Sequence, residues 1–196
     1  MMNRTMQANV IIHSHSAASA MVAGTAAMVP LFGPIVGDMV GITAITVSMC
    51  NSLAHLFDQH LEAEALWRFA AVVAGWVFGW TMLKTVIGLA PGAGSVASAA
   101  ITLSLQEATG WGIYSVFERG GDPTKMSKPD LKAAIAAGKL RAQAEKVNYE
   151  RAVGQLSPHE RDEVEQLQKL LADRSVSEAD KRAATDRIVA IFAVHN

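Results

Sequence analysis

A single carboxylate, that of Glu107, stands in the middle of a long apolar segment that covers residues 95–117. An ionised carboxylate in apolar surroundings is costly unless a cation or a hydrogen-bond donor lies beside it. Histidine is suited to this role, because its imidazole donates hydrogen bonds and takes up a proton near neutral pH. The chemistry open to this chain therefore depends on which histidine the fold brings to Glu107.

Helical rise places several polar side chains at a depth similar to that of Glu107. Two Pro/Gly-rich breaks, at residues 30–38 and 91–95, each separate two apolar segments. If these segments are antiparallel helices, a rise of 1.5 Å per residue puts Glu107 about 18 Å from its break. By the same rise, four further polar residues lie about 20 to 26 Å from the other break: His13, His15, Asn51 and His55.

We predict a buried polar cluster in which Glu107 meets His13 or His15, joined by Asn51 or His55. Three interpretations remain open. The cluster sets the packing register between two helical hairpins, or it is a proton-responsive or ion-binding site, or Glu107 instead faces a subunit interface or water.

No established motif for catalysis or metal binding accompanies these residues in the sequence. His13 and His15 are two positions apart, so a helix directs them to different faces. There is no His-Glu-x-x-His, no paired-cysteine motif and no Gly-x-Ser-x-Gly elbow. The one cysteine, Cys50, lies in an apolar segment and is typical of a small buried hydrophobe. We therefore expect no enzyme, no metal and no cofactor.

The elements that must position the cluster are four apolar segments, at residues 8–29, 39–57, 69–90 and 95–117. As a helix, each is long enough to cross a hydrocarbon core of ~30 Å. Residues 1–118 hold nine of the 35 formal charges, and the other 26 fall in the last 78 residues. The sequence predicts an all-α protein in which residues 1–119 form two consecutive apolar helical hairpins, a membrane-associated four-helix bundle.

A charged helical tail follows a linker at residues 120–128. Capping boxes and proline positions predict helices at about 129–153, 158–173 and 178–194, and residues 129–196 are expected to be a soluble unit. A cap is a side chain that accepts the free N–H groups of a helix's first turn. The predicted caps, in both parts of the chain, are Asp38, Ser95, Ser127, Ser157 and Ser177. Two apolar stripes in the tail, Val164 to Leu171 and Ala184 to Phe192, predict packing between its last two helices or onto a partner.

Membrane association is expected because the first two apolar segments offer no formal charge to water, and large exposed apolar faces are rare on soluble monomers. Either lipid or other subunits must then cover them. Gly75-x-x-x-Gly79 predicts close packing between helices. The apolar character continues to Phe57, which argues against a cleaved signal peptide. Basic residues after the last apolar segment place the tail and the N-terminus on the cytoplasmic side. Four spans, two hairpins that dip into the bilayer, and a soluble oligomer all remain open.

The first 120 residues resemble a known family. The resemblance, which covers residues 8–120, rests on His13 followed by small residues and on two motifs, Pro30-x-x-x-Pro34-x-x-x-Asp38 and Met49-x-x-x-Leu53-Ala54. Together they resemble the domain-of-unknown-function family 697, a hydrophobic helical module often found with Era-like GTPase domains. The resemblance implies a helical membrane-associated fold and a GTPase partner, and it implies no catalytic residues. No Gly-x-x-x-x-Gly-Lys-Ser/Thr phosphate loop is present in this chain.

Three function classes remain open, and the first is favoured. The first is a non-enzymatic membrane module that binds protein partners through a cytoplasmic tail. The alternative is a homo-oligomer, either soluble or inserted in a membrane like a pore, whose subunits bury each other's apolar helices. The third is an enzyme or transporter that uses the ionisable groups of the apolar segments. A net charge of −1 favours none of them, and it does not point to nucleic acid.

Overall fold

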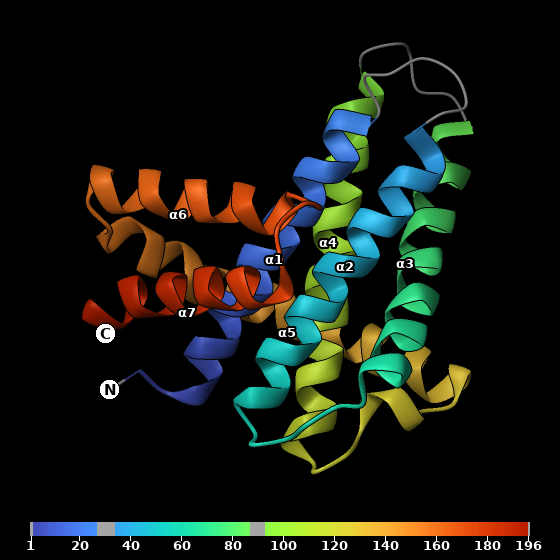
Figure 1. Ribbon diagram of the computed structural model, residues 1–196, viewed down its shortest axis with the longest axis horizontal. Coiled ribbons are helices and arrows are strands. Elements are labelled where there is room, and N and C mark those ends of the chain that lie inside the picture. The colour runs from blue at the N-terminus through green and yellow to red at the C-terminus, as the bar shows by residue number, and fades with distance from the viewer. Residues whose placement is uncertain (1, 27–33, 87–92, 196) are drawn as a thin grey trace.

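The computed structural model describes residues 2–26, 34–86 and 93–195, with the backbone alone at residues 24–26, 34–39, 77–86 and 93–98. The described part is entirely helical, which confirms the all-α prediction (Figure 1). Besides a short 3-10 turn at Pro123–Lys125, it contains α1 (Arg4–Ala26), α2 (Pro34–His55), α3 (Ala63–Val86), α4 (Ala93–Glu118), α5 (Lys128–Gln155), α6 (Pro158–Ala172) and α7 (Glu178–Val194).

The first four helices run alternately in opposite directions, and the last three lie across one side of them (Figure 1). Helix α1 contacts α2 and α4, and it also contacts α5, α6 and α7. Helix α3 lies at the other edge, against α2 and α4. The predicted helical tail therefore packs onto the apolar helices, while the domain boundary predicted at residues 120–128 stays a prediction.

The position of α1 explains its lack of charge. Its side chains from Ala8 to Ser16 are all buried, and the helices that cover them include all three of the tail. A helix that is covered on every side has no face for charged residues. The expectation that lipid or other subunits must cover this helix was incomplete, because it left out the chain's own last three helices.

The predicted caps divide into two groups. Ser127, Ser157 and Ser177 are the N-caps of α5, α6 and α7, as predicted, and Ser157 and Glu160 form a reciprocal capping box. Helix α2 begins at Pro34 and α4 at Ala93, so Asp38 and Ser95 stand inside these helices and not before them. Both predicted helix starts were wrong, because residues 34–37 and 93–94, assigned to the breaks, already belong to α2 and α4. The side chains of Asp38 and Ser95 lie outside the described residues.

Close packing between helices occurs at a pair of glycines that the sequence analysis did not single out. Gly112 of α4 and Gly138 of α5 meet so closely that a Cβ on Gly112 would lie 2.7 Å from the carbonyl oxygen of Ala134. A Cβ on Gly138 would overlap the carbonyl oxygen of Ala108. At Gly75, by contrast, an added Cβ would meet no described atom within 4 Å. The close packing predicted at Gly75 is therefore not found. The surroundings of Gly79 lie outside the described residues.

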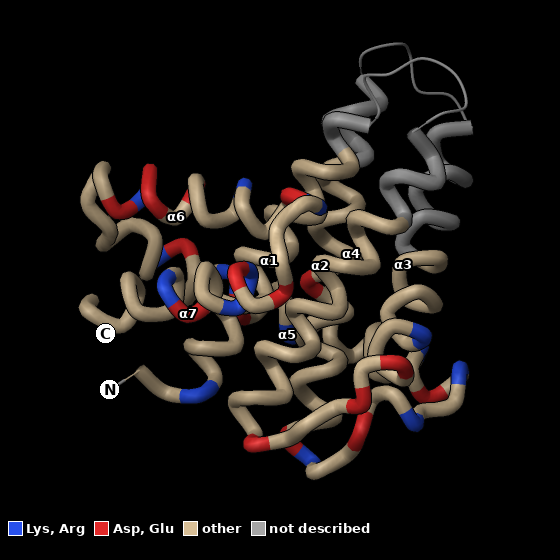
Figure 2. Tube along the Cα trace, viewed as in Figure 1, with Lys and Arg blue, Asp and Glu red and all other residues tan. Residues whose placement is uncertain are grey.

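Charge is distributed unevenly over the fold (Figure 2). Among the described residues, charges gather on α5, α6 and α7 and around the end of the first four helices where α2 leads into α3. Within residues 2–26, 34–86 and 93–195, no helix has both the length and the hydropathy needed to cross a bilayer, so the expected spanning helices are not found there.

Candidate functional site

The most unusual polar feature of the interior is an ion pair between α1 and α4. Nδ1 of His13 lies 2.7 Å from Oε1 of Glu107, and the two side chains are only 6% and 11% exposed. The predicted pairing of Glu107 with one of the first two histidines is confirmed, with His13 as the partner. Burial makes each group dependent on the other, because an unpaired charge there would lack water to solvate it.

Aromatic side chains of the tail helices α5 and α7 stack against this pair. The ring of Tyr149, in α5, stacks on the imidazole of His13 with centroids 4.1 Å apart and planes 17° apart. Phe192, in α7, stacks in turn on Tyr149 at 5.7 Å. Burial raises the pKa of Tyr149 to about 12, against the opposing hydrogen bonds of Gln168 and Ser14, and the Glu107 carboxylate adds to the rise. The phenol is therefore neutral at physiological pH, and the stack ties α5 and α7 to the ion pair.

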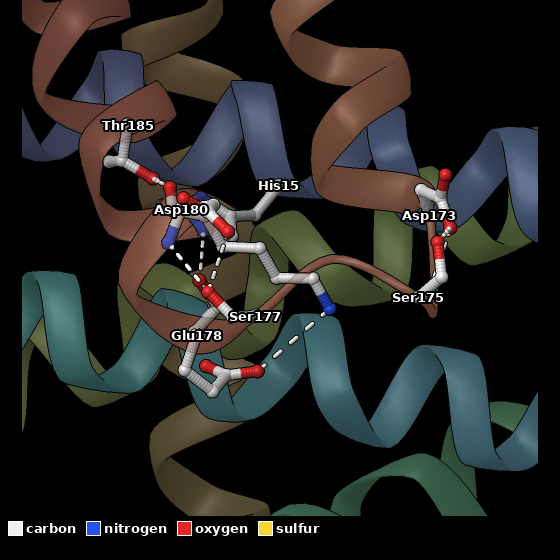
Figure 3. A network of polar contacts seen from close by, with 9 residues as sticks. His15, Asp173, Ser175, Ser177, Glu178, Asp180 and Thr185 are labelled. Carbon is white, nitrogen blue, oxygen red and sulfur yellow. Dashed lines mark hydrogen bonds and ion pairs between the residues drawn. The ribbon is translucent and has the colours of Figure 1, made fainter.

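His15 does not join Glu107, because two residues along α1 turn it to a different face. Its Nδ1 lies 2.8 Å from the carbonyl oxygen of Ile11, and its Nε2 lies 3.2 Å from Oγ of Ser48 in α2. Figure 3 draws His15 together with the polar residues at the start of α7. Burial lowers the pKa of His15 to about 4, and the positive charge of Lys181 in α7 lowers it further, against the Ile11 hydrogen bond. His15 is neutral in the folded protein, so Nδ1–H donates to Ile11 and Nε2 accepts from Ser48.

The burial of neutral His15 predicts a loss of stability in mild acid. The folded pKa of about 4 lies below the ordinary value of 6.5. Between these two pH values the unfolded chain takes up a proton that the folded protein does not. The free energy of unfolding should therefore have its full value above pH 6.5, and it should fall by about 3 kcal/mol as the pH drops to 4.

Urea unfolding at pH steps from 4 to 7 measures this slope. His15→Asn should reduce the slope of the free energy of unfolding against pH by the equivalent of nearly one proton taken up on unfolding. His159→Asn, at an exposed position of α6, should leave this slope unchanged. If His15→Asn keeps the wild-type slope, the assignment of the acid sensitivity to His15 is wrong.

A second polar layer lies next to the ion pair, and the sequence analysis missed it. Nε2 of Gln106 donates to Oγ of Ser19 at 3.1 Å and to Oγ1 of Thr46 at 2.9 Å, which joins α4 to α1 and α2. Thr46 donates in turn to the carbonyl oxygen of Ile42 at 2.7 Å. The available signal was an uncharged amide beside Glu107 in an apolar segment, which a count of formal charges does not register.

The other predicted members of the cluster lie elsewhere. His55 stands edge-on to His60, with ring centroids 5.8 Å apart, and Asn51 is half-buried in α2. Within the described part of the chain, no hydrogen bond or ion pair joins Asn51 or His55 to Glu107. Helical rise estimates depth along a helix, and it carries no information on which face a side chain occupies. Cys50 is buried, and this burial raises the pKa of its thiol, so it is a packing residue, as predicted.

Comparison with known proteins adds no identification: no known protein family, curated protein or solved structure matches this chain. The resemblance to the domain-of-unknown-function family 697 stays a prediction.

The buried polar side chains of α1 and its neighbours are arranged to hold these helices in one packing register. Among the described residues, no group of three or more His, Cys, Asp or Glu side chains could hold a metal ion. The polar contacts from α1 reach α4 through Glu107 and Gln106, α2 through Ser48, and α5 through Tyr149. Gln106 in turn joins α4 to Thr46 of α2. A one-residue slip of α1 would break several of these contacts at once. Buried polar networks of this kind specify one packing arrangement.

Proposed function

We propose that this protein is a non-enzymatic, membrane-associated helical module that inserts the apolar end of α1–α4 into one leaflet and holds protein partners through α5–α7. In this proposal α1–α4 form a bundle, and the buried polar core sets its register. In this proposal the two hairpins dip into the bilayer, which suits breaks that carry almost no formal charge.

The distribution of charge carries the proposal. Residues 24–39 and 77–98 contain the two breaks and the adjoining helix ends, and their only formal charges are Asp38 and Lys84. The last three helices, by contrast, hold most of the charge of the chain. A protein that meets hydrocarbon at one end and water at the other shows this separation.

A depth of insertion into the bilayer can be estimated under this proposal. Helix α5 crosses α4 where Gly138 meets Ala108, fifteen residues from the start of α4 at Ala93. At 1.5 Å per residue this is about 22 Å of helix beyond the crossing. Half of a bilayer, with its headgroup region, is about 20 Å thick. Under this proposal α5 lies at the level of the headgroups, and the tail and the N-terminus face the cytoplasm.

A second candidate function is a homo-oligomer in which subunits cover each other along α3. Trp67 and Val72 are 42% and 38% exposed on this helix, at the edge of the fold. The resemblance to the domain-of-unknown-function family 697 adds a GTPase as a candidate protein partner for α5–α7 in either case.

Flotation with vesicles of phosphatidylcholine and phosphatidylglycerol tests the membrane proposal. The wild-type chain should float with the vesicles. The double variant Phe32→Asp, Leu89→Asp should lose at least about tenfold in bound fraction, because each buried charge costs about 2.5 to 3.5 kcal/mol in hydrocarbon.

Leu140→Asp is the matched control, because Leu140 is 71% exposed on α5, away from the apolar end. It should float like wild type. Equal flotation of the double variant and the control would contradict insertion. A detergent-free mass well above the 20.8 kDa of one chain, unchanged by vesicles, would favour the homo-oligomer.

A further inference from the structure

An apolar groove runs between α4 and α5, on the side of the crossing that faces the start of α4. It has a volume of about 420 Å³, and its walls include Ile101 and Leu105 of α4 and Ile135 of α5. Ala108, at its end, is buried at the crossing, whereas Ala136 is exposed at the rim. The volume falls in the range of small-molecule sites, about 300 to 1,000 Å³.

The charge around this groove has one sign. Among the described residues that line it, Lys139 is the only charged one. Lys132 lies seven residues earlier in α5, and a helix brings residues 132, 135, 136 and 139 to one face. The ammonium of Lys132 stands 5.7 Å from the ring centroid of Trp76 in α3. Both lysine side chains are exposed.

An apolar channel with cations at its mouth is complementary to an amphipathic anion. A neutral lipid would leave the lysines without a counter-ion, and a small inorganic anion would leave the apolar walls uncovered. The α4 wall of the groove lies between the crossing at Ala108 and the start of the helix, which under the proposed function lies in the bilayer. An anionic lipid of the same leaflet would enter it without leaving the membrane.

We infer that the groove between α4 and α5 binds one anionic phospholipid, with an acyl chain along Ile101, Leu105 and Ile135 and the headgroup phosphate at Lys139 and Lys132. This inference rests on the proposed function for the source of the lipid, and it adds the lipid class. The site would give the module a preference for anionic membranes beyond general surface attraction, because it recognises a single molecule.

Titration of the full chain with dihexanoyl-phosphatidylglycerol, below its micelle concentration, tests the site without a membrane. Calorimetry should show saturable binding of one molecule, with no saturable binding of dihexanoyl-phosphatidylcholine or of inorganic phosphate. Lys139→Glu should weaken the affinity at least about tenfold, because it removes an attractive charge and puts a repulsive one in its place. Ala136→Phe, which fills the groove from its rim, should abolish binding.

Lys169→Glu is the matched control: it makes the same charge change at a 62% exposed position of α6, and it should bind like wild type. Equal affinity for both lipids, no saturable binding, or an unaffected Lys139→Glu variant would each overturn the lipid site. Phe32→Asp, Leu89→Asp should still bind the soluble lipid. Saturable lipid binding without vesicle flotation would therefore refute the proposed function alone, and flotation without saturable binding would refute the lipid site alone.

Discussion

Replacing Gly138 by alanine is expected to lower the free energy of unfolding by about 3 kcal/mol, through overpacking at a helix crossing. The new Cβ would overlap the carbonyl oxygen of Ala108, and it would lie 2.5 Å from the backbone nitrogen of Gly112. Both atoms belong to the backbone of α4, so no side chain can rotate to make room. The loss should exceed the gain of about 1 kcal/mol that alanine brings to a helix interior. Urea unfolding followed by circular dichroism measures the difference.

Gly154→Ala is the matched control for this prediction. Gly154 also belongs to α5, and an added Cβ there would meet nothing within 4 Å. The variant should be unchanged or more stable, by up to about 1 kcal/mol. If Gly138→Ala and Gly154→Ala are equally stable, the close contact of α4 and α5 is wrong, and with it the wall of the lipid groove.

Replacing Glu107 by leucine should have a comparable effect, a loss of about 3 to 5 kcal/mol in the free energy of unfolding at pH 7. The change leaves the buried imidazole of His13 without its partner on Nδ1, and burial prevents water from replacing it. Glu107→Gln should cost less than about 1.5 kcal/mol, because its amide oxygen still accepts the hydrogen bond from a neutral imidazole. Urea unfolding of both variants gives the comparison.

The double variant His13→Leu, Glu107→Leu separates pairing from simple loss of packing. It should be more stable than Glu107→Leu alone, because removing both members leaves neither side chain of the pair without its partner. If Glu107→Leu is as stable as Glu107→Gln, the ion pair does not contribute to the fold. A double variant that is less stable than either single variant would mean that both side chains act only through packing volume.

Much of the local structure could be predicted from the sequence alone, because it depends on neighbouring residues. The starts of α5, α6 and α7 follow from Ser127, Ser157 and Ser177, whose hydroxyls accept backbone N–H groups within their own first turns. The starts of α2 and α4 were misplaced, because a Pro/Gly run shows that a helix is interrupted but does not show how many residues the turn needs.

The same distinction between local and tertiary causes applies to the polar core. A carboxylate in an apolar segment requires a partner wherever it lies, so Glu107 by itself predicted a nearby histidine. The choice of His13 over His15 depended on the face of α1 that meets α4, which is set by packing in three dimensions. Tyr149 and Gln106 entered the core for the same reason, since neither has a local pattern that reveals its neighbours.

The largest difference concerns what covers the apolar helices. The burial of α1 could be predicted from the sequence, because no charge interrupts this helix from Thr5 to Ala26. The sequence could not determine what covers it, since lipid, another subunit and the chain's own tail all remove apolar side chains from water equally well. The contacts of the folded chain show that α5, α6 and α7 cover α1, and that Gly112 and Gly138 bring α5 against α4. Burial is a property of a residue's own chemistry, whereas the identity of its cover depends on contacts between segments far apart in the chain.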